Sequence, residues 1–231
     1  MTRKILAEAL GALLLTACVV GSGIMAERLA AGNAAVALLA NTLATVAALA
    51  TLIVLFGPVS GAHFNPAISA VALYRRQIEA STAAMYVVAQ IVGCCAGAML
   101  ANAMFELPLV NLSSHARHGP AQWLSEFVAT VGLLLVINGC VRTGRGDMVA
   151  VAVGVWIGGA YWFTSSTSFA NPAVTIGRTL TDTFAGIAPA SVPMFVVMQL
   201  AGALAAWFLI RLLFPTAAAS STPTPTARSD R

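Results

Sequence analysis

Charged side chains are scarce in this chain. Only 9% of its 231 residues are Asp, Glu, Lys or Arg, against about 25% in an ordinary soluble domain. Hydrophobic residues make up 59% of the chain, and the mean hydropathy is +0.87. This composition is typical of a protein that lies in a lipid bilayer. The net charge of +4 is too small and too dispersed to favour a nucleic-acid partner.

Paired cysteines and enzyme signatures are also missing. The four cysteines, Cys18, Cys94, Cys95 and Cys140, have no CxxC spacing, so we expect free thiols that pack as small apolar side chains. Neither HExxH nor GxSxG occurs in the sequence, although many hydrolases carry one of them. We therefore expect no enzyme activity, no cofactor and no bound metal.

Long apolar segments are what the chain does have. Six of them are each near the ~20 residues that cross about 30 Å of hydrocarbon. They cover residues 4–25, 34–56, 82–105, 123–141, 149–164 and 192–214. The sequence thus predicts an all-α membrane protein with one domain over residues 1–214. Residues 215–231, rich in Ala, Ser, Thr and Pro, are predicted to form a disordered cytoplasmic tail.

The basic residues predict the orientation, because Lys and Arg accumulate in cytoplasmic loops. With both termini inside, nine basic residues are cytoplasmic and three are outside. The inside set is Arg3, Lys4, Arg75, Arg76, Arg142, Arg145, Arg211, Arg228 and Arg231, and the outside set is Arg28, Arg117 and Arg178. We expect a multi-pass protein of the plasma (inner) membrane with cytoplasmic N- and C-termini.

The tripeptide Asn-Pro-Ala occurs twice, as Asn65-Pro66-Ala67 and as Asn171-Pro172-Ala173. Asn is a favoured helix N-cap and Pro is suited to the first helical position, so each copy predicts the start of a helix. Such a start beside membrane spans needs a cavity, because unsatisfied backbone at bilayer depth is tolerated only where it is buried or faces water.

An internal repeat accounts for the second copy. Glu8 in the first span matches Glu126 in the fourth, and the third span (residues 87–93) matches the sixth (residues 196–202). Repeats of about 4–106 and 121–214 contain three spans each, so they insert with opposite topology. The sequence predicts six transmembrane helices plus two re-entrant half-helices in an inverted 3+3 repeat. The half-helices should meet near the midplane.

These features resemble the aquaporin, or major intrinsic protein, family over residues 3 to about 214. The resemblance rests on Ser60-Gly61-Ala62-His63-Phe64 before the first Asn-Pro-Ala, on the second copy, and on the repeated Glu. It implies a homotetramer in the lipid bilayer whose subunits each hold a pore. Glu8 and Glu126 would support the half-helix loops, although a proton relay stays open for buried carboxylates. Carbonyls lining the pore would belong to Gly61, Ala62, His63, Thr167, Ser168 and Phe169.

The electrostatics and hydrogen-bond donors of such a pore favour small neutral solutes. Both half-helices direct their partially positive N-terminal ends at the centre, which disfavours cations. The amides of Asn65 and Asn171 can donate to a passing oxygen atom. In the family, a constriction outside the midplane sets selectivity, and motif spacing places it at Thr45, Gly159, Ser168 and Val174. Val174 stands where the family usually has Arg, so we expect a wider opening with one charge fewer.

The cargo is predicted from a narrower resemblance. Residues 166–174, 21–28 and 181–186 are similar to the bacterial aquaglyceroporin-like subgroup associated with arsenic-resistance genes. That resemblance implies passage of undissociated arsenite, other metalloid acids and small polyols as well as water. Alternatives are a general glycerol/water facilitator, which usually has Arg then Asp where this chain has Val174 and Thr175, an ion-coupled secondary transporter, and a non-conducting assembly protein.

Overall fold

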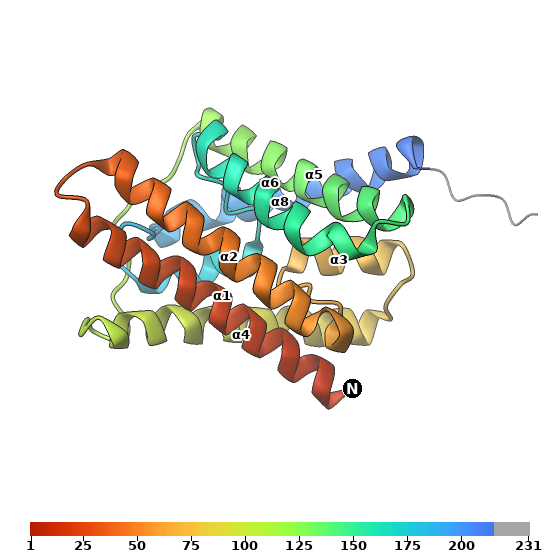
Figure 1. The fold of residues 1–231 in the computed structure, drawn as a ribbon, viewed down its shortest axis with the longest axis horizontal. Coiled ribbons are helices and arrows are strands. Elements are labelled where there is room, and N and C mark those ends of the chain that lie inside the picture. The colour runs from red at the N-terminus through yellow and green to blue at the C-terminus, as the bar shows by residue number, and fades with distance from the viewer. Residues whose placement is uncertain (215–231) are drawn as a thin grey trace, which may run out of the picture.

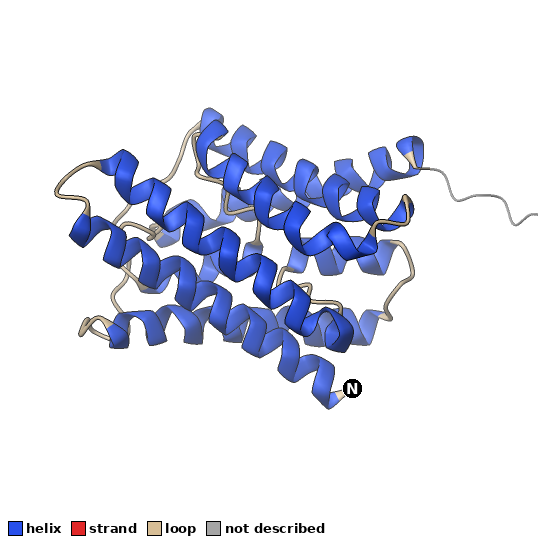
Figure 2. Ribbon diagram, in the orientation of Figure 1, coloured by secondary structure: helices blue, strands red, loops and turns tan. Residues whose placement is uncertain are grey.

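The computed structural model describes residues 1–214, and the predicted disordered tail lies outside the described residues. The described part is helical and contains no strand (Figure 2). The helices are α1 (Thr2–Leu29), α2 (Ala34–Ser60), α3 (Pro66–Tyr74), α4 (Ala80–Met104), α5 (Pro120–Arg142), α6 (Val149–Phe163), α7 (Pro172–Gly177) and α8 (Val192–Leu213), with short 3-10 turns η1 (Gly146–Met148), η2 (Arg178–Leu180) and η3 (Pro189–Ser191).

Six of these helices are long and apolar enough to cross a membrane, which confirms the predicted fold class. Two helices extend four residues beyond the predicted span ends: α1 ends at Leu29 where residue 25 was expected, and α2 ends at Ser60 where residue 56 was expected. Helix α2 continues through Pro58 to Ser60 and ends where Gly61 adopts a left-handed φ of 90°. This extra turn carries Ser60 to the edge of the following loop.

The long helices run side by side along one direction, and the N-terminus and the end of α8 lie at the same end of the molecule (Figure 1). Helix α1 packs extensively against α4 in the first half of the chain, and α5 packs against α8 in the second half. The short helices α3 and α7 contact each other. Their positions fill the space between the two halves.

Two glycines let α1 and α4 approach closely. A Cβ atom built on Gly97 would lie 2.2 Å from the Leu13 carbonyl oxygen, and one on Gly93 would lie 2.3 Å from that of Ala9. Small residues at such positions allow van der Waals contact between backbones, which is a main source of helix association in membranes.

We expect Gly97→Val to lower the free energy of unfolding by about 1–3 kcal/mol, because the added side chain meets backbone that cannot move aside. Thermal unfolding of the purified protein in detergent measures this. Gly159→Val is the matched control, since a Cβ at Gly159 has no heavy atom within 4 Å. Equal loss of stability in both variants would contradict the assigned helix contact.

Candidate functional site

Both Asn-Pro-Ala segments begin a short helix. The Asn65 side-chain oxygen accepts from the Ala67 N–H at 2.9 Å, and Pro66 is the first residue of α3. The Asn171 oxygen accepts from the Ala173 N–H at 3.0 Å, with Pro172 opening α7. The structure thus has the two capped helix starts that the sequence predicts.

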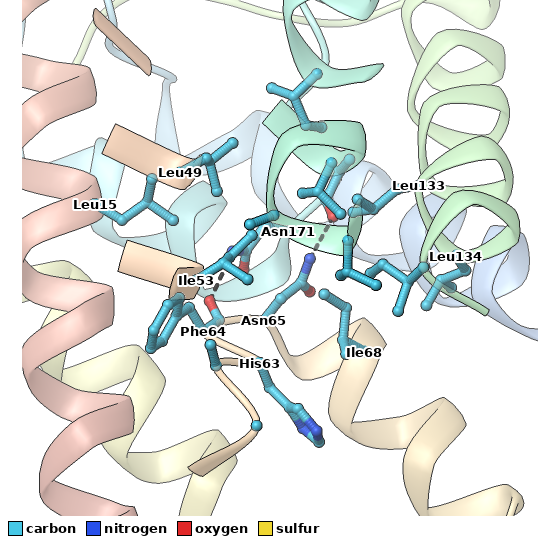
Figure 3. A pocket seen from close by; sticks show the side chains of 18 of the residues that line it. Leu15, Leu49, Ile53, His63, Phe64, Asn65, Ile68, Leu133, Leu134 and Asn171 are labelled. Carbon is cyan, nitrogen blue, oxygen red and sulfur yellow. Dashed lines mark hydrogen bonds between the residues drawn. The ribbon is translucent and has the colours of Figure 1, made fainter. Parts of the chain in front are cut away.

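The two Asn side chains also cross-link the halves of the chain. Nδ2 of Asn65 donates to the Ala170 carbonyl at 2.8 Å, and Nδ2 of Asn171 donates to the Phe64 carbonyl at 2.8 Å (Figure 3). An amide nitrogen has two N–H groups, so each Asn keeps one more donor. The half-helices therefore meet with their N-terminal ends together.

The loops before the two motifs share an unusual backbone. Six residues have left-handed φ values at positions that are paired by a constant offset of 106 residues. They are Gly61 (90°), Ala62 (50°) and Phe64 (49°) in the first loop, and Thr167 (61°), Ser168 (51°) and Ala170 (47°) in the second. Non-glycine residues rarely adopt this region, and such strain persists only where the surroundings hold the chain in place.

Glu8 holds the first loop. Its carboxylate is fully buried and accepts four hydrogen bonds. The donors are the Ser60 hydroxyl at 2.6 Å, the His63 N–H at 2.9 Å, the Phe64 N–H at 2.7 Å and the Gln90 amide at 2.7 Å. A buried carboxylate with four donors is satisfied, and it fixes both peptide groups of the strained turn.

Glu126 repeats this arrangement in the second half. It is equally buried and accepts from the Ser166 hydroxyl at 2.6 Å, the Phe169 N–H at 2.9 Å, the Ala170 N–H at 2.9 Å and the Gln199 amide at 2.6 Å. Each Gln amide also donates to a hydroxyl on its half-helix, Ser69 at 3.0 Å or Thr175 at 2.9 Å. Helix, loop and half-helix are therefore tied together in each repeat.

A cavity of about 580 Å³ runs past the two Asn side chains. Near the end that holds the N-terminus, Arg75 and Asp147 line it, and beyond Asn65 and Asn171 it reaches Arg178. Much of its wall is apolar, formed by Leu15, Leu49, Ile53, Ile68, Leu133 and Leu134 (Figure 3). An apolar path with a few donors at its centre can pass a small neutral molecule in single file.

Most of the predicted pore residues line this cavity. They include Gly61, Ala62, His63, Ser168 and Phe169 from the two loops and Thr45 and Val174 from the predicted constriction. Thr167 is absent from the lining residues. The His63 ring is oriented by α3, because its Nδ1 lies 3.0 Å from the Ser69 hydroxyl.

The structure corrects the placement of Gly159. This residue is exposed and does not line the cavity. It continues a stripe of exposed residues on α6 with Val151 and Val155, four residues apart and therefore on one helix face. The lining face of α6 carries Val153, Ile157 and Tyr161 instead.

Sequence reasoning missed Tyr161 as a lining residue. Its hydroxyl lies 3.2 Å from the Thr45 hydroxyl, and this contact joins α6 to its neighbour α2 at the cavity wall. The four-residue spacing of Val153, Ile157 and Tyr161 is the signal that could have identified it. A tyrosine at this point adds both bulk and a hydroxyl group to the predicted constriction.

Comparison with known proteins agrees with this geometry. The model of the family described as "Major intrinsic protein" matches residues 1–168 and 122–229. The chain belongs to the major intrinsic protein family. The resemblance predicted from the two motifs is thus confirmed, and with it a multi-pass membrane protein of a family of channels rather than enzymes.

Individual members of the family are similar over most of the chain. Aquaglyceroporin AqpS of Rhizobium meliloti (strain 1021) is 51% identical over 217 residues, which cover 94% of this chain and 92% of the relative. Human Aquaporin-5 is 32% identical over 73% of this chain and 66% of its own length. The X-ray structure of the aquaglyceroporin from Plasmodium falciparum shares the fold, with a TM-score of 0.70, 18% identity, and coverage of 92% of this chain and 98% of that one.

Proposed function

We propose that the protein is a passive transmembrane channel for small neutral solutes, among them arsenite and other metalloid acids, small polyols and water. The observation that carries the proposal is the cavity that is lined by both Asn65 and Asn171 and has Val174 in its wall directly after the second Asn-Pro-Ala. A relative that is 51% identical over most of the chain and is named an aquaglyceroporin supports a solute wider than water.

The polarity of the cavity favours an uncharged cargo. The N-terminal ends of α3 and α7 meet at Asn65 and Asn171, and their dipoles repel cations. An anion would have to leave water for a mostly apolar wall, which is costly without a partner. Undissociated arsenite and glycerol carry several hydroxyl groups and no charge, and they can accept from the Asn amides one after another.

The proposed assembly is a homotetramer in the plasma (inner) membrane with cytoplasmic termini. The N-terminus and the end of α8 lie at the same end of the molecule (Figure 1). Arg3 and Lys4 lie in the first turn of α1, Arg211 lies in the last turn of α8, and Arg142 donates to the Phe214 carbonyl just after α8. Basic residues gather in this way at a cytoplasmic face. Each subunit holds its own cavity, so conduction by one subunit needs no residue from another.

Flux into vesicles that contain the purified protein tests the proposal, with gradients of water, glycerol, urea and arsenite applied separately. A channel gives fast flux that does not saturate and does not depend on ions. Accumulation of a solute driven by a sodium or proton gradient would show a secondary transporter. Vesicles that behave like protein-free controls in all four gradients would leave only a structural role.

A further inference from the structure

Two buried arginines lie beside the second half-helix loop. Arg178 is 3% exposed and Arg117 is 7% exposed. Within residues 1–214, neither guanidinium forms an ion pair with a carboxylate. Buried charges are usually paired, so these two call for a physical explanation.

Every guanidinium nitrogen of Arg117 donates to a backbone carbonyl. Its Nε donates to the Gly186 carbonyl at 2.8 Å, and its two terminal nitrogens donate to the Phe184 carbonyl at 3.3 Å and the Ser166 carbonyl at 3.5 Å. It is not among the cavity-lining residues. Arg117 therefore holds the outer loops in position and does not donate to a solute in the cavity.

Arg178 is different. In the part of the chain that the structure describes, its guanidinium makes one hydrogen bond, from Nε to the Ala185 carbonyl. Its two terminal NH₂ groups have no protein acceptor, and the side chain lines the cavity. Its flat face stacks on the Phe169 ring at 3.5 Å from the centroid, with Arg117 at 5.1 Å from the same centroid. Stacking fixes the guanidinium while its edge stays available.

The position of Arg178 relates it to the missing filter charge. It follows Val174 by four residues, directly after the end of α7 at Gly177, where it opens the 3-10 turn η2. Both residues line the cavity. Burial lowers the pKa of His115 most, Arg117 and Arg178 lower it further, and Asp182 and Glu27 act in the opposite direction. Burial also lowers the pKa of Arg117, to about 10, which leaves it charged at neutral pH.

We propose that Arg178 supplies, one turn beyond Val174, the positive charge and the N–H donors of the outer part of the path, and that it is a specificity-determining residue of the channel. This rests on the proposed channel function. An arginine side chain stays protonated, and a fixed positive charge in a narrow passage with low-dielectric walls opposes cations. Its free N–H groups bind hydroxyl oxygens of a neutral solute. Because the charge lies about one turn further along the chain than position 174, the smaller Val174 side chain leaves room for a solute wider than water.

The test is Arg178→Gln in reconstituted vesicles, read by potassium and proton leak under an imposed membrane potential. We expect the cation leak to rise by about tenfold or more, because the fixed charge is lost while donors of an amide remain. Arg28→Gln is the matched control: it removes a charge from the same outer end, where Arg28 donates to the Phe105 carbonyl and does not line the cavity. It should leave the leak unchanged.

Two further variants distinguish an effect of the lost charge from an effect of misfolding. Arg178→Lys keeps the charge and should hold the leak near that of the original protein. The double variant Val174→Arg, Arg178→Val returns the charge to the earlier turn and should restore the barrier while it reduces glycerol flux. A low leak in folded Arg178→Gln, or an equal leak in Arg178→Lys and Arg178→Gln, would overturn the proposal. Glycerol flux through the unaltered protein is measured in parallel, so a failure of the channel function itself is recognised separately.

Discussion

Val174→Arg is expected to reduce permeability to arsenite and glycerol by about tenfold or more and to leave water permeability within about twofold. Val174 is buried in the cavity wall, so a long charged side chain there must enter the path. It would also stand one turn from Arg178. The passage narrows, and two like charges face the solute together. Stopped-flow light scattering of reconstituted vesicles measures both permeabilities.

Val174→Met is the control for bulk, because it adds length without charge. If Val174→Met reduces glycerol flux as much as Val174→Arg, size alone sets the effect. Equal loss of water and glycerol flux in Val174→Arg, with normal thermal unfolding, would show that Val174 does not belong to the selective constriction.

The central elements of the site were predictable because they are local. Asn followed by Pro specifies a helix start by its own hydrogen bond and ring geometry, and Asn65 and Asn171 form the predicted caps. The buried Glu8 and Glu126 were recognisable because a carboxylate in an apolar span needs several donors. The six spans followed from length and hydropathy. None of these inferences required the register of one helix against another.

The constriction was harder to predict, because it depends on register. Counting back twelve residues from Asn171 gives Gly159, but the face of α6 that meets α2 decides which side chain enters the cavity, and that face carries Tyr161. The sequence predicts only that Arg178 is one of three basic residues on the outer side of the membrane. Its burial against Phe169 arises from the fold of the loop after α7, and no local pattern in the sequence encodes it.

The cross-link between the Asn side chains also changes how the centre of the path works. The sequence suggested that both amides serve the solute. Each amide instead donates one N–H to a carbonyl of the opposite loop. The second N–H of each amide is therefore held in a fixed direction. A passing solute therefore meets donors that are already oriented, without rearrangement of the protein.

Glu126→Leu is expected to prevent recovery of folded, conducting protein. Four buried donors would lose their acceptor, namely the Ser166 hydroxyl, the N–H groups of Phe169 and Ala170, and the Gln199 amide. Each unsatisfied buried group costs about 1–3 kcal/mol, so the sum approaches the ~5–15 kcal/mol that stabilises a whole protein. Expression in membranes, size-exclusion profile and thermal unfolding measure the loss.

The matched variants test whether the carboxylate acts through these contacts. Glu27→Leu removes an exposed carboxylate from α1 and should leave folding and flux unchanged. The exchange Glu126→Gln with Gln199→Glu keeps one carboxylate and one amide at a contact of 2.6 Å, and it should recover more folded protein than Glu126→Leu because an anionic acceptor stays beside the loop. Full stability and flux in Glu126→Leu would contradict loop support. Loss of proton leak alone, with water flux intact, would instead favour the proton relay, because only that role needs a group that exchanges protons.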